Sequence, residues 1–216
     1  VIHDAKTAGD FARELQLLLQ TINISDAQME RGEMRVEANI SVSKTDELGT
    51  KVEVKNLNSF KSVEGAIAYE IDRQIMLLEK GETISQETRG WDEVKLRTYT
   101  QRSKESAKDY RYFPEPDLPK LYLHSMYDLD MVKNNLPELP WVKRERFSKD
   151  FGVKGSDIEV FVNDIVMADY FESVLDEVGD TNLAQTIANY ITSDLSGIMK
   201  LDKNALLPTP EDFGEL

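Results

Sequence analysis

The chain has 216 residues, of which 40% are hydrophobic and 31% charged, so it suits one large domain or two small ones with a packed core. It contains no cysteine, which excludes disulfide bonds and thiolate metal sites. The net charge of −14 argues against a general nucleic-acid-binding surface. No apolar run approaches the roughly 20 residues that span a membrane.

The first 80 residues alternate between helical and extended patterns. Phe11, Leu15, Leu18 and Leu19 recur at helical spacing and predict a helix over 8–21. Apolar and polar residues then alternate strictly over 33–43 and again over 50–56, which is typical of strands with one buried face. The short polar loop between them predicts a hairpin. An apolar stripe predicts a second helix over about 60–80, with Ser59 or Ser62 as its cap and Gly81 after its end.

The next 40 residues predict the rest of a first domain. Residues 83–89 and 95–101 are expected to form two strands joined across 90–93. The segment 109–119 has three prolines between 114 and 119, which excludes a helix and predicts an ordered, extended loop that closes the domain. We therefore expect a first domain over 1–120.

Residues 121–216 have a helical character and predict a second domain. Three segments have helical apolar patterns, and the acidic tail from Pro208 is expected to fray. The predicted helices cover 141–151, 157–178 and 182–200.

Two glutamates share the polar face of the predicted hairpin. One register that keeps the apolar faces together places Glu53 opposite Asn39 and Glu37 opposite Lys55, and a slip by one residue pair places the two glutamates opposite each other. Carboxylates are ligands that Mg²⁺ prefers, and lysine or arginine beside them would balance nucleotide phosphates. The alternative is a set of solvated cross-strand ion pairs. The basic and amide members of this face are Arg35, Asn39, Lys51 and Lys55.

A second candidate region is basic and aromatic. Residues 89–111 contain seven basic and four acidic side chains, against the acidic trend of the chain. Such a stretch can bind phosphates and stack a nucleobase, or it can be an ordinary basic surface with its aromatic residues in the core. No glycine-rich phosphate loop is present, so a nucleotide site would have to be built on strands. The residues concerned are Arg89, Arg97, Arg102, Lys104, Lys108, Arg111, Trp91, Tyr99, Tyr110 and Tyr112.

Five segments together resemble the B-subunit (GatB) family of the aspartyl/glutamyl-tRNA amidotransferases. They occur in the family's order, and two shorter stretches, 168–171 and 188–190, resemble its helical domain. The five segments are 34–42, 49–60, 86–92, 102–105 and 109–119.

The resemblance implies a fold and an activity. The fold is an α+β cradle related to glutamine synthetase, an antiparallel sheet with packed helices, followed by an all-α domain. The activity uses ATP and Mg²⁺ to phosphorylate the side-chain carboxylate of Glu or Asp on a misacylated tRNA. Ammonia from the amidase A subunit then displaces the phosphate, within a heterotrimer that includes a small C subunit. A bacterial cytoplasmic or organellar matrix location, without a membrane, is implied.

The resemblance also implies roles for individual residues. Glu37 and Glu53 match the family's metal-binding acidic positions and are expected to be catalytic. The family usually has Asp at the first position, and the extra methylene of Glu37 moves the carboxylate by roughly 1.5 Å. The family's N-terminal acidic segments and C-terminal tail domain find no match, so we expect a central fragment that is inactive alone. The expected nucleotide contacts are Arg35, Asn39, Lys51, Lys55, Arg89 and Arg111.

Two other functions remain open at this point. One is a non-catalytic tRNA-binding or scaffold module that retains the fold. The other is an unrelated α+β nucleotide enzyme, which only the acidic hairpin and the basic stretch support.

Overall fold

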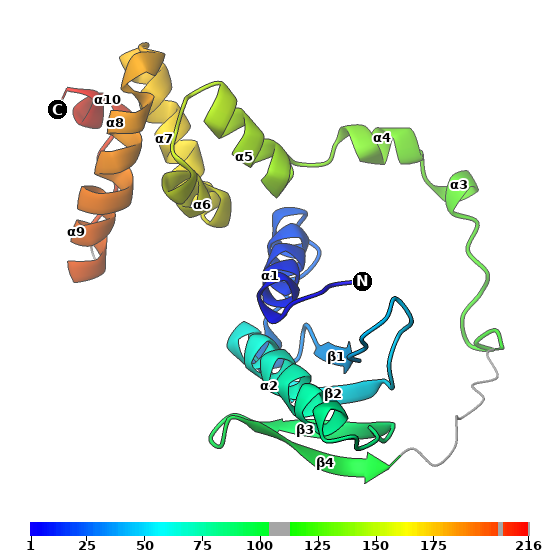
Figure 1. Ribbon diagram of the computed structural model, residues 1–216. Coiled ribbons are helices and arrows are strands. Elements are labelled where there is room, and N and C mark those ends of the chain that lie inside the picture. Colours follow the sequence, from blue (N-terminus) through cyan, green and yellow to red (C-terminus); the bar gives the residue numbers. More distant parts are fainter. Residues whose placement is uncertain (104–112, 203–204, 216) are drawn as a thin grey trace. The chain divides into compact units, whose positions relative to one another are not determined.

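A computed structural model describes residues 1–103, 113–202 and 205–215 of the protein (Figure 1). The chain divides into two units, Val1–Asn135 and Leu136–Leu216.

A four-stranded mixed sheet and two long helices form the first unit. The strand order is β1-β2-β3-β4, and α2 lies along one face of the sheet with α1 beside it (Figure 1). The unit is therefore of the α+β class. The elements are α1 (Ala5–Thr21), η1 (Met29–Arg31), β1 (Val36–Ile40), β2 (Val52–Leu57), α2 (Phe60–Glu79), β3 (Glu87–Asp92) and β4 (Arg97–Ser103).

The predicted hairpin is present, with a bulge. In the antiparallel pair of β1 and β2, Asn39 lies opposite Glu53 and Ile40 opposite Val52. The register shifts between Val36 and Ala38, so that two residues of β2 oppose Glu37. One of the two is Asn56, whose φ of 65° lies in the left-handed region that asparagine tolerates better than most residues. The bulge therefore sits beside the first of the two candidate glutamates.

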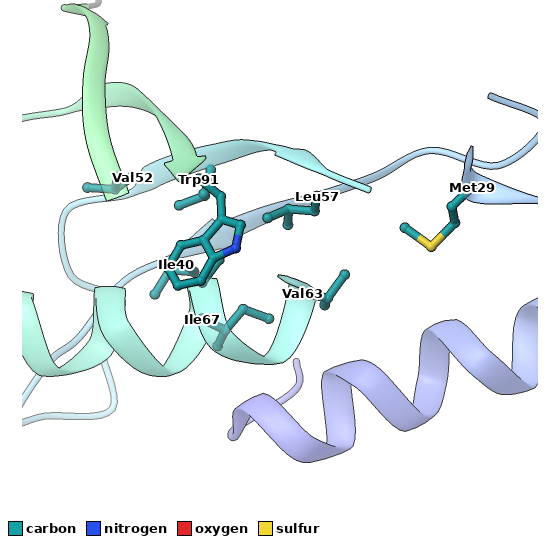
Figure 2. Packing of buried hydrophobic residues seen from close by; sticks show 9 residues of the cluster. Met29, Ile40, Val52, Leu57, Val63, Ile67 and Trp91 are labelled. Atoms are coloured by element: carbon teal, nitrogen blue, oxygen red, sulfur yellow. The ribbon is translucent and has the colours of Figure 1, made fainter. Parts of the chain in front are cut away.

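The core lies between the sheet and α2. Val52 and Val54 of β2 alternate with the polar residues of the strand, Leu57 follows the bulge, and all three are buried in the cluster against the helix. Figure 2 shows the indole of Trp91 reaching from β3 towards Ile67 of α2. A side chain at Gly65 of α2 would lie 3.1 Å from this indole, so glycine permits the close approach. Alternation in the strands thus fixes which face of the sheet is covered.

The prediction of an antiparallel sheet is wrong for one pair of strands. β2 and β3 are parallel, with Glu53 beside Thr88 and Lys55 beside Gly90. Parallel neighbours need a crossover connection of a dozen or more residues, and the 20 residues of α2 provide it. Ser59 caps α2 through the backbone N–H of Ser62, and Gly81 follows its end with a φ of 76°. This helix was predicted to within a residue of its observed end.

The turn between β3 and β4 lies later than predicted. Gly90, Trp91 and Asp92 belong to β3, and the turn covers 93–96. The carboxylate of Asp92 accepts hydrogen bonds from the backbone N–H groups of Val94 and Lys95, and it thereby closes the turn. These two hydrogen bonds also hold the pKa of Asp92 below its ordinary value.

The rest of the first unit contains two short helices. Residues 113–122 lie outside any helix or strand and are exposed, and the remainder of the proline-containing segment lies outside the described residues. None of the helices in the described part of the chain is long and apolar enough to cross a membrane. The two short helices are α3 (Leu123–Met126) and α4 (Leu129–Asn134).

The elements described in the second unit are all helical. Phe147, Phe161 and Phe171 form its aromatic centre, with ring centroids 4.8 to 5.7 Å apart. The domain boundary expected at 120/121 and the family's all-α domain stay predictions. The elements are α5 (Pro140–Lys149), α6 (Gly155–Asn163), α7 (Ile165–Val178), η2 (Thr181–Leu183), α8 (Ala184–Asn189), the π-helical η3 (Tyr190–Leu195), α9 (Ser196–Leu201) and α10 (Pro210–Gly214).

Two predictions for this unit are wrong. The helix expected over 157–178 is broken at Asp164, whose backbone is extended and whose carboxylate caps α7. The tail expected to fray forms α10, because Thr209 caps it and Phe213 is buried with its ring 5.7 Å from that of Tyr170.

Candidate nucleotide and metal site on the open face of the sheet

The sheet has one face covered by α2 and one face that is not, which we call the open face. Strand alternation places Glu37 and Asn39 of β1 on the open face, together with Glu53 and Lys55 of β2. Thr88 belongs to the same face, because its hydroxyl Oγ1 donates a hydrogen bond to Glu53 Oε2 at 2.9 Å. The two candidate glutamates are thus brought together by the pairing of β1 with β2.

The pairing of all four strands arranges the open face in two rows. The first row runs from Asn39 through Glu53 and Thr88 to the register position of Arg102. The second row starts at the bulge beside Glu37 and runs through Lys55 and Gly90 to Tyr99. Carboxylates therefore lie at one end of the face and an aromatic residue lies at the other end.

Lys55 lies between the two carboxylates. Its Nζ atom is 3.4 Å from Glu37 Oε2 and 3.8 Å from Glu53 Oε1. Arg35 Nη2 lies 2.7 Å from the other oxygen of Glu37. The two carboxylates and the two cations balance one another in charge, and the side chains of Glu53 and Glu37 are only 17% and 29% exposed. The end of the cluster at Glu53 is therefore more enclosed than an ordinary surface ion pair, whereas the Arg35 side chain at the other end is 72% exposed.

The arrangement fits one side of a magnesium site. Two carboxylates already share a cation, the ammonium of Lys55, and Mg²⁺ is usually held by one or two carboxylates with phosphates and water. Within 1–103, 113–202 and 205–215, no group of three or more His, Cys, Asp or Glu side chains is placed to hold a metal ion. A metal ion bound here would take two carboxylate ligands from the described residues, Glu37 and Glu53.

Arg89 does not lie on the open face. It alternates with Thr88 and therefore lies on the face covered by α2. On that face its Nη1 donates to Oε1 of Glu87 in β3 at 2.7 Å, and its Nε donates to Oγ1 of Thr98 in β4 at 2.8 Å. Its Nε also lies 3.5 Å from the fully buried carboxylate of Glu70. The structure thus separates Arg89 from the other predicted nucleotide contacts.

The remaining predicted contacts have different outcomes. Lys51 is exposed directly before β2, and Asn39 is exposed opposite Glu53. Arg111 lies outside the described residues, as do Lys104, Lys108, Tyr110 and Tyr112. Trp91 belongs to the core and is 7% exposed, whereas Tyr99 lies on the open face and is 43% exposed.

A buried polar network on the covered face anchors the strands of the site. The amide of Gln74 on α2 accepts a hydrogen bond from the backbone N–H of Val42 and donates one to the carbonyl of Ile40, where β1 ends. The same amide donates to Glu70 Oε1 at 3.0 Å, and Glu70 accepts from Thr98 of β4 at 3.1 Å. These buried side chains connect the outer strands through α2. Sequence reasoning missed them; it included Thr88 in the basic stretch but did not foresee its hydrogen bond to Glu53.

Comparison with known proteins shows the class of protein to which this fold and site belong. The family profile described as the GatB/GatE catalytic domain matches residues 1–127. The chain belongs to this family.

Relatives of the chain include B subunits of amidotransferases. The chain is 41% identical over 220 residues to the B subunit of the aspartyl/glutamyl-tRNA(Asn/Gln) amidotransferase of Crocosphaera subtropica, covering 100% of the chain and 44% of that protein. It is 43% identical over 216 residues to a B subunit of the same name from Clostridium acetobutylicum, covering 98% and 44%. It is 42% identical over 216 residues to the B subunit of the chloroplastic/mitochondrial glutamyl-tRNA(Gln) amidotransferase of Oryza sativa subsp. japonica, covering 97% and 39%. The chain thus spans less than half the length of these curated relatives.

Proposed function

We propose that the chain forms part of the B subunit of a tRNA-dependent amidotransferase, a carbon–nitrogen ligase that uses glutamine as its amide donor. In this proposal the open face binds Mg²⁺ and ATP for phosphorylation of the side-chain carboxylate of Glu-tRNA(Gln) or Asp-tRNA(Asn). The observation that carries the proposal is the pair of carboxylates, Glu37 and Glu53, that share one cation on a sheet face of a GatB-family domain.

The residues of the open face have separate roles in this reaction. Glu37 and Glu53 would hold Mg²⁺, which would neutralise charge on the transferring phosphoryl group. Thr88 orients Glu53 through its hydrogen bond, and the pairing with Asn39 fixes the backbone of Glu53. Lys55 lies within ion-pair distance of both carboxylates and Arg35 within ion-pair distance of Glu37, so both cations would be available to balance the charge of the phosphates. Lys51 stands at the start of β2 as a further phosphate contact.

The chemistry divides into two substitutions. A side-chain carboxylate oxygen attacks the γ-phosphorus of ATP, the bond to the β–γ bridging oxygen breaks, and ADP leaves. Ammonia then attacks the acyl carbon, inorganic phosphate leaves with the electron pair of the carbon–oxygen bond, and the amide loses a proton to solvent. The first step is needed because a carboxylate has no adequate leaving group.

The proposal includes partners and a location. An amidase A subunit supplies ammonia from glutamine, a small C subunit completes a heterotrimer, and the misacylated tRNA presents the carboxylate. The protein would work in the bacterial cytoplasm or in an organellar matrix. By itself the chain would be inactive, because the two carboxylates make only one side of the metal site.

Amidation of tRNA by the intact heterotrimer tests this function. Formation of Gln-tRNA(Gln) or Asn-tRNA(Asn) is measured with ATP and glutamine for the unmodified protein, Glu53→Gln and Glu37→Gln. Glu47→Gln, in the exposed loop of the same hairpin, is the matched control. We expect both site variants to lose at least about a hundredfold in rate, as for removal of one electrostatic contact in a transition state, and the control to stay active.

Unchanged amidation by Glu53→Gln and Glu37→Gln would contradict the assignment of the acidic pair. No amidation by the unmodified complex, together with retained tRNA binding, would favour the scaffold function.

A further inference from the structure

The structure sorts the aromatic residues of the basic stretch into two groups. Trp91 is buried against α2 and belongs to the core. Tyr99 lies on the opposite face of the sheet and is 43% exposed. Trp91 belongs to β3 and Tyr99 to the neighbouring strand β4. Among the four aromatic candidates of this stretch, Tyr99 is the one that the structure describes on the face with Glu37 and Glu53.

The ring of Tyr99 leans across β3 above Gly90. A methyl group at Gly90 would lie 2.6 Å from Tyr99 Cζ and 2.7 Å from its hydroxyl oxygen. It would also lie 2.6 Å from the amide nitrogen of Gln101, which donates to the Tyr99 hydroxyl at 3.4 Å. The missing side chain of Gly90 therefore makes the space in which the ring lies over the sheet.

The ring lies at a useful distance from the carboxylates. Gly90 pairs with Tyr99 on one side and with Lys55 on the other, and Lys55 contacts both glutamates. Because the far end of the ring lies over Gly90 of β3, one to two strand spacings separate it from the carboxylates of β2 and β1, which is roughly 5–10 Å. A nucleoside triphosphate spans this distance from its phosphates to its base when it is bent. The row thus offers cation and phosphate contacts at one end and an aromatic surface at the other.

We propose that Tyr99, held over Gly90, is the surface on which the base of the bound nucleoside triphosphate stacks. The inference rests on the proposed function, since it takes the metal and the phosphates to lie at Glu37 and Glu53. Stacking on an aromatic ring tolerates any base, because every base has a π-face. Tyr99 therefore adds affinity for the nucleoside part of the ligand and none for its phosphates.

Paired titrations with two probes test the inference. Magnesium complexes of ATP and of inorganic tripolyphosphate, which has the phosphates without a nucleoside, are titrated into the intact protein by calorimetry. We expect Tyr99→Ala to weaken ATP binding by about 5- to 100-fold, the effect of losing one base–aromatic stack. Tripolyphosphate binding should stay within about twofold. Tyr99→Phe should bind ATP like the unmodified protein, and Tyr190→Ala, an exposed tyrosine of the second unit, is the control.

A second variant tests the part played by Gly90. Gly90→Ala places a methyl group against the far end of the Tyr99 side chain, which can swing away at little cost to the fold. We expect the same selective loss of ATP affinity, and no further loss when the change is made in Tyr99→Ala.

The outcomes separate this inference from the function on which it rests. Equal weakening of both probes by Tyr99→Ala would show a structural role for the ring and overturn the inference. Unchanged ATP binding by Tyr99→Ala, with weakened binding by Glu53→Gln, would overturn the inference and leave the proposed function standing. Failure of the unmodified protein to bind either probe would overturn both.

Discussion

Removal of the charge on Glu70 tests the account of how the sheet is held. Glu70 is fully buried on α2, and its carboxylate accepts hydrogen bonds from Arg73 at 2.9 and 2.6 Å. It also accepts from Gln74 at 3.0 Å and from Thr98 at 3.1 Å. The hydrogen bonds that Arg73 donates to Glu70 hold the pKa of Arg73 above its ordinary value. Glu70→Gln keeps the size of the side chain and removes the charge that these donors share.

The expected cost follows from the contacts that are lost and from those that remain. Removal of one partner from a buried ion pair typically costs about 3–5 kcal/mol. Arg89 would keep Glu87, whose Oε1 lies 2.7 Å from its Nη1, and the side chain of Arg73 is 20% exposed. We therefore expect the low end of the range, a loss of about 3 kcal/mol in the free energy of unfolding.

Fluorescence during urea unfolding provides the assay. Trp91 is buried beside α2, and the other tryptophan, Trp141, lies in the second unit. A Trp141→Phe background therefore reports the first unit alone. Glu79→Gln, an exposed glutamate of the same helix, is the matched control and should change stability by less than about 0.5 kcal/mol. A Glu70→Gln protein as stable as this control, with the same dependence on urea, would refute the account of the network.

Three further predictions concern other parts of the chain. Hydrogen bonds from Arg146 hold the pKa of Glu138 below its ordinary value of 4.5. Ionised Glu138 therefore stabilises the second unit fully above about pH 4.5, and this stabilisation is lost as the pH falls through the lowered pKa. Glu138→Gln should therefore make thermal unfolding less dependent on pH in acid, and an unchanged acid profile would contradict this. Phe213→Ala should destabilise the second unit by about 2–4 kcal/mol in calorimetry, because the ring is buried against Tyr170; a change below about 0.5 kcal/mol would show that α10 is not docked. Asn56→Val should cost about 1–2 kcal/mol in chemical unfolding, because Asn56 has a φ of 65°, and Asn56→Gly should be nearly neutral. Equal effects of the two Asn56 changes would argue against the bulge.

The hairpin was predictable because apolar and polar residues alternate along both of its strands. Only registers that bury Val52 and Val54 keep the apolar faces together, and one of the two registers considered, with Glu53 opposite Asn39, is the observed one. The bulge was not predictable, since it depends on the backbone of a single residue, Asn56. As a result Lys55 meets Glu37 through an ion pair beside the bulge and not through a regular strand pair.

The main error in the predicted fold concerns the bounds and direction of β3. Part of the information needed to place this strand is present in nearby residues. The length of α2 already indicated a crossover, which favours parallel strands. Alternation from Trp91 back to Arg89 would have placed this arginine on the covered face with the tryptophan. Arg89 has one carboxylate partner in its own strand, Glu87, but its buried partner, Glu70, lies 19 positions away on a helix, and no spacing rule connects such a pair.

The break at Asp164 was also visible in principle. Aspartate is a preferred helix cap, and this one accepts from the backbone N–H groups of Val166 and Met167. The folding of the tail was not visible, because Phe213 is the anchor of α10 only through its contact with Tyr170 of a distant helix.

The dependence of ATP cleavage on magnesium distinguishes a metal site on the open face from a structural cluster of ion pairs. ADP formation is followed with misacylated tRNA and ammonium chloride in place of glutamine, so that the amidase step does not contribute. We expect Glu53→Gln to need at least about tenfold more Mg²⁺ for half-maximal activity, because one of two carboxylate ligands is lost. Glu47→Gln should follow the unmodified curve. A Glu53→Gln curve that coincides with the unmodified one would contradict the assignment of the open face as the metal and nucleotide site.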